Sequence, residues 1–274
     1  MGNALAGLAR RLALPVLRGA LCCALSAAPH AQTPVEPAQA AVLVYHRFGP
    51  VVADSMTTRT EVFRAQLDAL RQAGYHFVTL KDLVAGLQGS AALPAKAVAI
   101  TADDGHRTVY TDMLPVIREQ HLPVTLFIYP SAISNASYAL TWEQLQELAH
   151  TDGVDIQSHT FWHPNFHTEK RRLSPEDYQR FVRTQLEKPR QVLKQKLGVE
   201  ADCLAWPFGI YDDELDAAAR AAGYRAAFIL GNRNASGEDP VMALPRYLIV
   251  DAVGVNGLLR ELQAGVRTSK GSRP

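Results

Sequence analysis

Short apolar runs alternate with longer amphipathic segments along most of the chain. Uninterrupted runs are typical of parallel strands, because helices cover both faces of such a sheet. We predict eight strands on this basis: residues 41–45, 76–80, 97–101, 124–129, 154–157, 203–206, 226–230 and 247–250. Their regular recurrence predicts a fold assembled from repeated strand and helix units.

Polar residues and prolines mark helix boundaries between these runs. Thr141 begins a segment with the spacing of a capping box, and Ser174 stands before Pro175 as an N-cap stands before a proline in the first turn. Gly198 occupies the position expected for the end of the following helix. Pro189 lies inside that helical pattern, so we expect it to kink or divide the helix.

Strand and helix units in alternation indicate an α/β protein with a parallel sheet, either open or closed into a barrel. No glycine-rich dinucleotide or phosphate-binding motif follows any of the runs, which argues against an open nucleotide-binding sheet. The domain, residues 41–265, is at the short end of the range for a regular eightfold barrel. We therefore predict one domain that forms a distorted (β/α) barrel of about seven parallel strands.

The two ends of the chain have a different character. Residues 1–31 contain three arginines and no acidic residue, followed by an apolar stretch and small residues, which is the pattern of a signal peptide. Arg18 interrupts the apolar stretch, so no transmembrane span is expected. Residues 32–40 are interpreted as a linker and residues 266–274 as a polar tail. We expect an exported protein, periplasmic or secreted, with association to the cell envelope left open.

Composition excludes several classes of protein. The 274 residues are 47% hydrophobic and 20% charged, with a net charge of +1, which excludes disordered and collagen-like chains. There is no basic excess of the kind that nucleic-acid-binding proteins carry, so no nucleic-acid partner is expected. Cys22 and Cys23 lie in the leader, which leaves Cys203 without an internal disulfide partner.

Candidate chemistry gathers where two predicted strands end. Residues 97–101 lead into Asp103 and Asp104, and residues 154–157 lead into His159 and His163. Adjacent carboxylates repel each other unless a cation or proton compensates. Two histidines four residues apart converge if the chain makes a helical turn, and an aspartate then completes a site for a divalent metal. Taken separately, the acidic pair also suits a turn or a helix cap, and a lone histidine suits a structural role.

The two segments resemble the first two motifs of the polysaccharide deacetylase family, also called the NodB-homology family. Residues 101–105 read Thr-Ala-Asp-Asp-Gly, similar to Thr-Phe-Asp-Asp-Gly, and residues 158–164 match Ser-His-Thr-x-x-His-Pro. Further similarity lies at residues 44–48, 122–127, 141–142 and 206–209. The resemblance covers roughly residues 41–250 and is strongest to bacterial enzymes that deacetylate poly-N-acetylglucosamine.

This resemblance implies a distorted barrel with one divalent metal ion. By the family pattern Asp104, His159 and His163 are the metal ligands, and Asp103 is the general base. Zinc is the favoured ion, while Co, Ni, Fe or Mn also suit such ligands. The third motif implies a backbone N–H near Phe208 that stabilises the oxyanion.

Aromatic residues near these motifs are candidates for contact with a sugar. Trp206, Phe161 and Trp162 offer faces for stacking, with core packing as the alternative.

The chain also departs from the family pattern. Ala102 and Ala205 replace the usual phenylalanine and the arginine that orients the catalytic aspartate, and the fourth and fifth motifs are missing. His46 is the candidate for the missing general acid, although it suits the support of a loop or a carboxylate equally well. His106 is the second candidate for the acid. Arg246 is the candidate for the missing arginine, with an ordinary salt bridge as the alternative.

One further histidine has the spacing of a metal ligand. His167 lies four residues beyond His163, but the proline and asparagine between them suggest that the chain has turned away.

The sequence thus predicts a metal-dependent hydrolase that removes N-acetyl groups from N-acetylhexosamine units of an extracellular or envelope polysaccharide. Two alternatives stay open: an O-acetyl esterase acting on xylan or another acetylated glycan, and a glycan-binding protein that has lost catalysis. The expected partner is the acetylated polysaccharide. The sequence does not indicate the oligomeric state.

Overall fold

The computed structural model describes residues 38–266, so the predicted signal peptide, most of the linker and most of the tail lie outside the described residues. The strands are β1 (Gln39–Tyr45), β2 (Arg47–Gly49), β3 (Thr57–Arg59), β4 (His76–Phe77), β5 (Ala97–Asp103), β6 (Val124–Ile128), β7 (Val154–Ser158), β8 (Cys203–Ala205), β9 (Ala226–Leu230), β10 (Ala235–Ser236) and β11 (Leu244–Leu248). The helices are α1 (Thr60–Gln72), α2 (Leu80–Leu87), α3 (Leu114–Gln120), α4 (Trp142–Ala149), α5 (Phe166–Arg172), α6 (Pro175–Leu197), α7 (Asp213–Ala221) and α8 (Gly254–Ala264). Short helical turns cover Val109–Met113, Pro207–Gly209 and Asp251–Val253.

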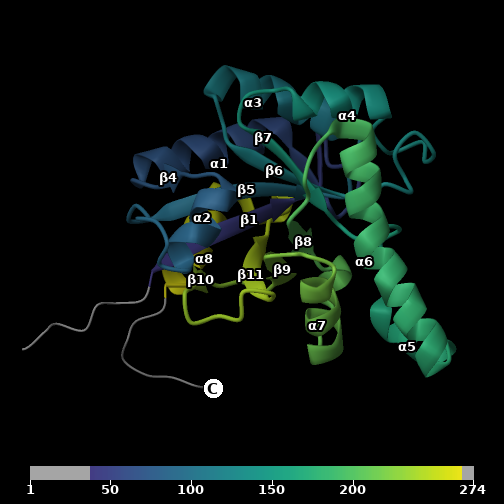
Figure 1. Ribbon diagram of the computed structural model, residues 1–274. Helices are drawn as coiled ribbons and strands as arrows, with labels where there is room; N and C mark the ends of the chain where they lie inside the picture. The colour runs from purple at the N-terminus through teal and green to yellow at the C-terminus, as the bar shows by residue number, and fades with distance from the viewer. Residues whose placement is uncertain (1–37, 267–274) are drawn as a thin grey trace, which may run out of the picture. The chain divides into compact units, whose positions relative to one another are not determined.

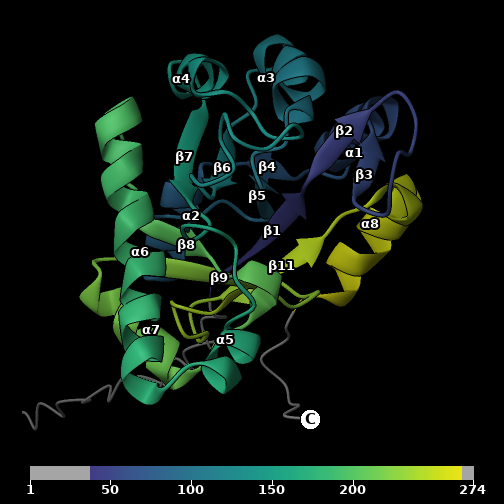
Figure 2. The same cartoon turned by 90° about the vertical axis from the view of Figure 1, so that its right-hand side faces the viewer.

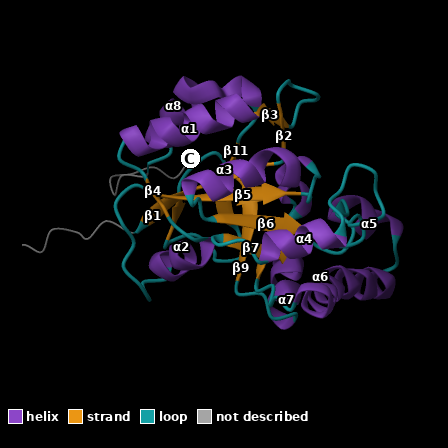
Figure 3. Ribbon diagram, turned by 90° about the horizontal axis from the view of Figure 1, so that it is seen from above, coloured by secondary structure: helices purple, strands orange, loops and turns teal. Residues whose placement is uncertain are grey.

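Seven parallel strands close into a barrel in the order β1-β11-β9-β8-β7-β6-β5, with β5 pairing back to β1. The pairing between β5 and β1 runs from Ala40 opposite Ala97 to Tyr45 opposite Ala102. The helices surround the strands when the molecule is viewed from above (Figure 3). This confirms the predicted α/β class and the distorted barrel of about seven strands.

The remaining strands lie outside the barrel. β4 pairs with one side of β5, β10 pairs antiparallel with the start of β1, and β2 and β3 form a separate two-stranded sheet. The apolar run at residues 76–80 therefore yields only a two-residue strand, because Leu80 already begins α2. The linker expected at 32–40 also ends early, since β1 begins at Gln39.

Side chains of the barrel strands are buried on both faces, which explains the uninterrupted apolar runs. On β5, Val98 and Ile100 pack in a cluster with residues of α1, α3, α4 and α8, whereas Ala97 and Ala99 belong to a second cluster inside the barrel. Successive residues of a strand point to opposite faces, so this alternation also fixes the direction of the polar residues that follow. Figure 1 shows α3 and α4 together at one side of these strands, and Figure 2 shows α1 beside α8.

The helix boundary signals are confirmed in detail. The Thr141 side chain accepts a hydrogen bond from the Gln144 backbone N–H, and the Gln144 side chain accepts one from the Thr141 N–H, which completes the capping box. Ser174 caps α6 in front of Pro175, and Gly198 ends that helix with a left-handed φ of 72°. Pro189 does not divide the helix, which continues through it for 23 residues.

Candidate active site

Asp103 is the last residue of β5 and faces the barrel interior. It shares the inner face with Thr101, two residues earlier on the strand. The chain then turns sharply, with φ of 74° at Asp104 and 66° at Gly105. A Cβ at residue 105 would lie 3.0 Å from the side chain of Ile128, so this turn has both a conformational and a steric need for glycine.

His159 and His163 lie in the irregular loop that follows β7. The helical turn assumed for their spacing does not form, because Thr160 and His163 have left-handed φ values of 66° and 61°. The loop is held by a hydrogen bond of 3.2 Å from the His163 backbone N–H to the Thr160 hydroxyl. Non-glycine residues rarely adopt a left-handed φ. This conformation occurs at Asp104 in one loop and at Thr160 and His163 in the other, so the surrounding structure imposes the shape of both loops.

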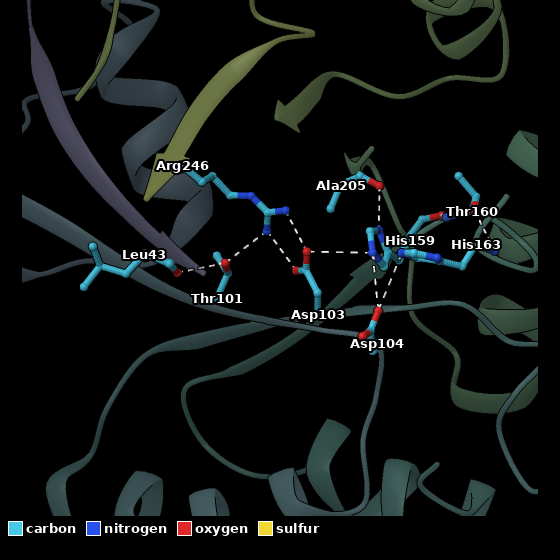
Figure 4. Close-up of polar contacts among 10 residues, drawn as sticks. Leu43, Thr101, Asp103, Asp104, His159, Thr160, His163, Ala205 and Arg246 are labelled. Carbon is cyan, nitrogen blue, oxygen red and sulfur yellow. Dashed lines mark hydrogen bonds and ion pairs between the residues drawn. The ribbon is translucent and has the colours of Figure 1, made fainter. Parts of the chain in front are cut away.

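The side chains of Asp104, His159 and His163 converge on one point, as Figure 4 shows. The Nε2 atoms of His159 and His163 lie 3.6 and 3.7 Å from Oδ1 of Asp104, and one ligand atom from each residue lies within 4.8 Å of the others. Among residues 38–266 this is the only group of three or more histidines, cysteines and acids with such geometry.

The orientation of His159 suits a metal ligand. Its Nδ1 lies 2.7 Å from the carbonyl oxygen of Ala205, and Nδ1 must carry the proton of that hydrogen bond because a carbonyl only accepts. In the neutral ring Nε2 then presents its lone pair toward Asp104. Burial lowers the pKa of His159 to about 3 and also lowers the pKa of His163, so both rings are neutral near pH 7.

Asp103 is not part of this triad, because a buried arginine holds it in place. Arg246, on β11, donates from Nη1 to Oδ1 of Asp103 at 2.8 Å and from Nη2 to Oδ2 at 2.7 Å. Nη1 also lies 3.2 Å from the hydroxyl of Thr101, which donates to the carbonyl of Leu43. The exposed fractions of Asp103 and Arg246 are only 2% and 1%. Such a two-bonded pair fixes both the position and the orientation of the carboxylate (Figure 4).

The charges of the cluster favour a cation. Burial by itself raises the pKa of Asp103, but the charge and hydrogen bonds of Arg246 outweigh it and lower the pKa to about 2. Burial raises the pKa of Asp104, which means that ionising Asp104 in this site is costly without a compensating charge. Two carboxylates and one guanidinium carry a net negative charge, and the neutral imidazoles add none. A divalent ion beside Asp104 would remove this cost, so the donor set suits a metal.

A cavity of about 220 Å³ opens over this cluster. Besides the two aspartates and two histidines it is lined by His46, Met56, Trp206, Phe208, Gly209, Leu230, Arg246 and Leu248. His46 follows β1, and its Nδ1 is buried without a hydrogen-bond partner among the described residues. His46 therefore lies in the lining of the same cavity as the two aspartates, and its role as an acid stays a prediction.

Phe208 and Trp206 occupy this cavity in different ways. The Phe208 side chain is 59% exposed, its backbone is left-handed with φ of 58°, and its ring centre lies 4.6 Å from that of His163. Trp206 is only 1% exposed, and its indole N–H donates to the carbonyl of Met242 at 2.9 Å. Of the two interpretations of Trp206, stacking and core packing, its burial and its indole hydrogen bond favour core packing, although Trp206 also lies in the cavity lining.

The other candidates lie outside the cavity. His106 is near the site but does not line the cavity, and its Nδ1 lies 2.9 Å from the hydroxyl of Thr108. His167 is exposed on α5 and is not part of the triad. Trp162 is exposed with its ring 5.3 Å from that of Phe181, while Lys188 lies over the ring of Phe161.

Comparison with known proteins decides the family. The family model for polysaccharide deacetylases matches residues 90–227, half of the chain, and this range contains Asp103, Asp104, His159 and His163. The chain belongs to the polysaccharide deacetylase family. Family membership identifies a hydrolase of the carbohydrate deacetylase type.

Individual relatives agree with this assignment. The deacetylase is 27% identical to the putative polysaccharide deacetylase YxkH of Bacillus subtilis, covering 78% of this chain and 72% of that protein. It is 25% identical to the poly-beta-1,6-N-acetyl-D-glucosamine N-deacetylase of Escherichia coli K12, covering 84% of this chain but only 39% of the longer relative. The solved structure of IcaB from Ammonifex degensii superposes with a TM-score of 0.71 at 26% identity, covering 81% of this chain and 96% of that one.

Sequence reasoning missed Met56, Leu230 and Leu248, which line the cavity of this deacetylase, and it also missed Tyr129 beside the two histidines. Tyr129 directly follows β6, and its ring centre lies 5.4 Å from that of His163 and 6.3 Å from that of His159. The signal was its place as the last residue of the apolar run 124–129, at the same end of the sheet as the two motifs.

Within residues 38–266 no helix is both long enough and apolar enough to cross a bilayer.

Proposed function

We propose that this chain is a metal-dependent hydrolase that removes N-acetyl groups from N-acetylhexosamine units of an extracellular or envelope polysaccharide. The observation that carries the proposal is the arrangement of two adjacent aspartates. Asp104 lies with two neutral histidines around one point, while Asp103 stays ionised and fixed beside it by Arg246. The named activity of the Escherichia coli relative supports the choice of an N-acetylated polymer.

Asp104, His159 and His163 would hold the divalent ion, and zinc suits this set, as do Co, Ni, Fe and Mn. When bound, the ion polarises the acetyl carbonyl and lowers the pKa of a water molecule that attacks it. Asp103 accepts a proton from this water through a carboxylate oxygen. Arg246 is a positioning residue in this scheme, because it holds that carboxylate in one orientation and keeps it ionised.

The remaining steps need a donor for the oxyanion and an acid for the leaving amine. We assign the first role to the backbone N–H of Phe208, on the loop that lines the cavity. We assign the second role to His46, which lines the same cavity and whose buried Nδ1 has no hydrogen-bond partner among the described residues. The carbon–nitrogen bond of the acetamide breaks, and the products are acetate and a free amine on the sugar.

Acetate release from a panel of acetylated glycans, with metal-stripped and metal-restored protein, tests the proposal. We expect release from N-acetylglucosamine polymers that disappears after chelation and returns with zinc, together with a new primary amine. A free hydroxyl without amine would instead establish the O-acetyl esterase. Binding of glycan without acetate release under any metal would establish a protein that has lost catalysis. An unchanged pH profile in His46→Ala would exclude the acid role of His46.

Export is also part of the proposal. It rests on the arginine-containing, acid-free and then apolar pattern of residues 1–31. Detection of the mature protein in the periplasm or medium, with its N-terminus beyond the leader, would support it.

A further inference from the structure

Four aromatic side chains contact one another in succession beside the candidate active site, and two of them, His163 and Phe208, line its cavity. The hydroxyls of Tyr138 and Tyr129 lie 2.5 Å apart, the ring of Tyr129 lies 5.4 Å from that of His163, and the ring of His163 lies 4.6 Å from that of Phe208. We call Tyr138, Tyr129, His163 and Phe208 the ring row. Its inner members are half-buried, whereas Tyr138 and Phe208 at its two ends are 39% and 59% exposed. The row therefore presents one open aromatic side chain on each side of a proposed metal ligand.

Tyr138 is held firmly to the loop that carries Asp104. The backbone N–H of Arg107 donates to the carbonyl of Tyr138 at 2.8 Å, and the N–H of Leu140 donates to the carbonyl of Gly105 at 2.9 Å. The ring of Tyr138 also lies nearly parallel to that of His106, at an angle of 9°. An exposed ring with this many constraints loses little conformational freedom when a ligand binds.

The other exposed apolar side chains gather around the same end of the barrel. Seven large hydrophobic side chains are exposed among the described residues: Val51, Val52, Tyr138, Trp162, Phe208, Leu230 and Val266. All except Val266 lie in loops beyond the carboxyl ends of the barrel strands or, for Leu230, at such an end. Two of them, Phe208 and Leu230, line the cavity itself, and exposed apolar side chains gathered at the end of the barrel that holds a cavity indicate a binding surface.

The topology puts the two ends of the ring row on opposite sides of the reaction centre. Tyr138 follows β6, His163 follows β7 and Phe208 follows β8, and these strands are neighbours in that order. A sugar ring has an apolar face of C–H groups that suits the face of an aromatic ring. A polymer that crosses the cavity thus meets an aromatic side chain before and after the unit that reacts.

We propose that Tyr138 and Phe208 form two sugar-binding subsites that flank the reacting unit, so that the enzyme acts on internal units of a glycan chain. This inference rests on the proposed function and adds the requirement for neighbouring sugars on both sides. Tyr138 is a specificity-determining residue in this scheme. It contacts the neighbouring sugar and has no part in the chemistry at the acetyl group.

The test uses β-1,6-linked N-acetylglucosamine oligomers from dimer to pentamer with the wild type, Tyr138→Ala and Tyr138→Phe. We expect kcat/KM to rise with chain length in the wild type. In Tyr138→Ala the advantage of the pentamer over the dimer should fall by about 2- to 10-fold, as a higher KM, the range expected for one aromatic contact. An advantage that stays unchanged would overturn the proposal.

The conservative variant separates the ring from its hydroxyl. Tyr138→Phe keeps the ring and loses only the bond to Tyr129, so it should retain most of the chain-length advantage. If it loses as much as Tyr138→Ala, the ring face is not the binding element and the assignment is wrong. Tyr75→Ala is the matched control, because Tyr75 precedes β4 at the opposite end of the strands. Thermal melting of each variant shows whether it is folded.

A second readout keeps this test independent of the proposed activity. Asp103→Asn protein is titrated with the pentamer by calorimetry, with and without Tyr138→Ala. If the wild type releases no acetate from any oligomer, the proposed function has failed, and the titration alone decides on the subsite. Weaker binding in the double variant would support the subsite, and equal binding would overturn it.

Discussion

At the amino end of the barrel a cavity of about 640 Å³ opens, nearly three times the size of the cavity of about 220 Å³ at the carboxyl end. β7 contributes to both ends, with Asp155 at its start and His159 just beyond its last residue. At the amino end, Gln157 donates to Asp155 at 2.9 Å and accepts from the Cys203 backbone N–H at 2.7 Å. Those polar groups are satisfied by one another and help to join β7 to β8.

At the carboxyl end Arg246 and Asp103 also satisfy each other, but further polar atoms converge there without hydrogen-bond partners in the described part of the chain. Three potential ligand atoms surround one point, and Nε of Arg246 and Nδ1 of His46 lack partners among the described residues. The smaller cavity is therefore the candidate for the active site, because converging polar groups with unused hydrogen-bonding atoms indicate function better than cavity size does.

The largest expected difference is in catalytic activity, between a variant that neutralises an aspartate at the carboxyl end and one that neutralises an aspartate at the amino end. Asp103→Asn should lower kcat/KM for acetate release by about 10²- to 10⁴-fold, the usual contribution of a general base. Its metal content should stay unchanged, because Asp103 lies outside the proposed ligand set. Asp155→Asn at the amino end should retain wild-type activity. Similar losses in the two variants, measured with the same substrate, would remove the functional distinction between the ends.

Removal of the buried arginine should have the next largest effect, on stability. Arg246→Met leaves Asp103 buried and unpaired, which should lower the free energy of unfolding by about 3–5 kcal/mol at pH 7. The exposed Arg225 at the amino end is the control, and Arg225→Met should change stability by less than about 0.5 kcal/mol. Urea unfolding of both variants measures the difference.

The pH dependence of this effect has a defined sign. The pKa of Asp103 is lowered from 3.8 to about 2 in the folded protein, so its ionised form stabilises the fold above pH 3.8. That contribution is lost as the pH falls toward 2. The stability gap between wild type and Arg246→Met, measured without metal, should therefore narrow over this range. A gap that is constant with pH would mean that the ion pair does not set this pKa.

The smallest effect concerns the thiol at the amino end. Burial raises the pKa of Cys203, and the nearby Asp202 carboxylate raises it further. Because only the thiolate reacts, iodoacetamide at pH 8 should label native Cys203 at least about tenfold more slowly than the unfolded chain. Peptide mapping by mass spectrometry distinguishes Cys203 from the leader cysteines. Rapid labelling of the folded protein would show that the amino-end cavity is more open than its side-chain contacts indicate.

The barrel could be predicted from sequence because its strands are buried on both faces. Uninterrupted apolar runs identified the positions of all seven barrel strands to within a few residues. The run at residues 76–80 misled because the Thr79 side chain caps α2 and turns the second half of the run into a helix. Local capping here outweighed the apolar pattern.

The candidate site could be predicted only in part. The two motifs at strand ends identified the candidates Asp103, Asp104, His159 and His163. Arg246 became a candidate because Ala205 stands where the family pattern has an arginine. The left-handed loops and the burial of Trp206 could not be predicted, since both depend on contacts with residues distant in the sequence. The pairing of Tyr129 with Tyr138 depends on the path of residues 131–140, which carry no strong periodic signal.

Arg246 stands on β11, the last strand that the chain contributes to the barrel. All three proposed metal ligands lie earlier in the chain, so a polypeptide ending before residue 244 would contain them and yet leave Asp103 without its guanidinium partner. The catalytic carboxylate of the proposed site can therefore be oriented only after the final barrel strand has been synthesised. A chain that ends before β11 would lack both the strand that joins β1 to β9 and the guanidinium that orients Asp103.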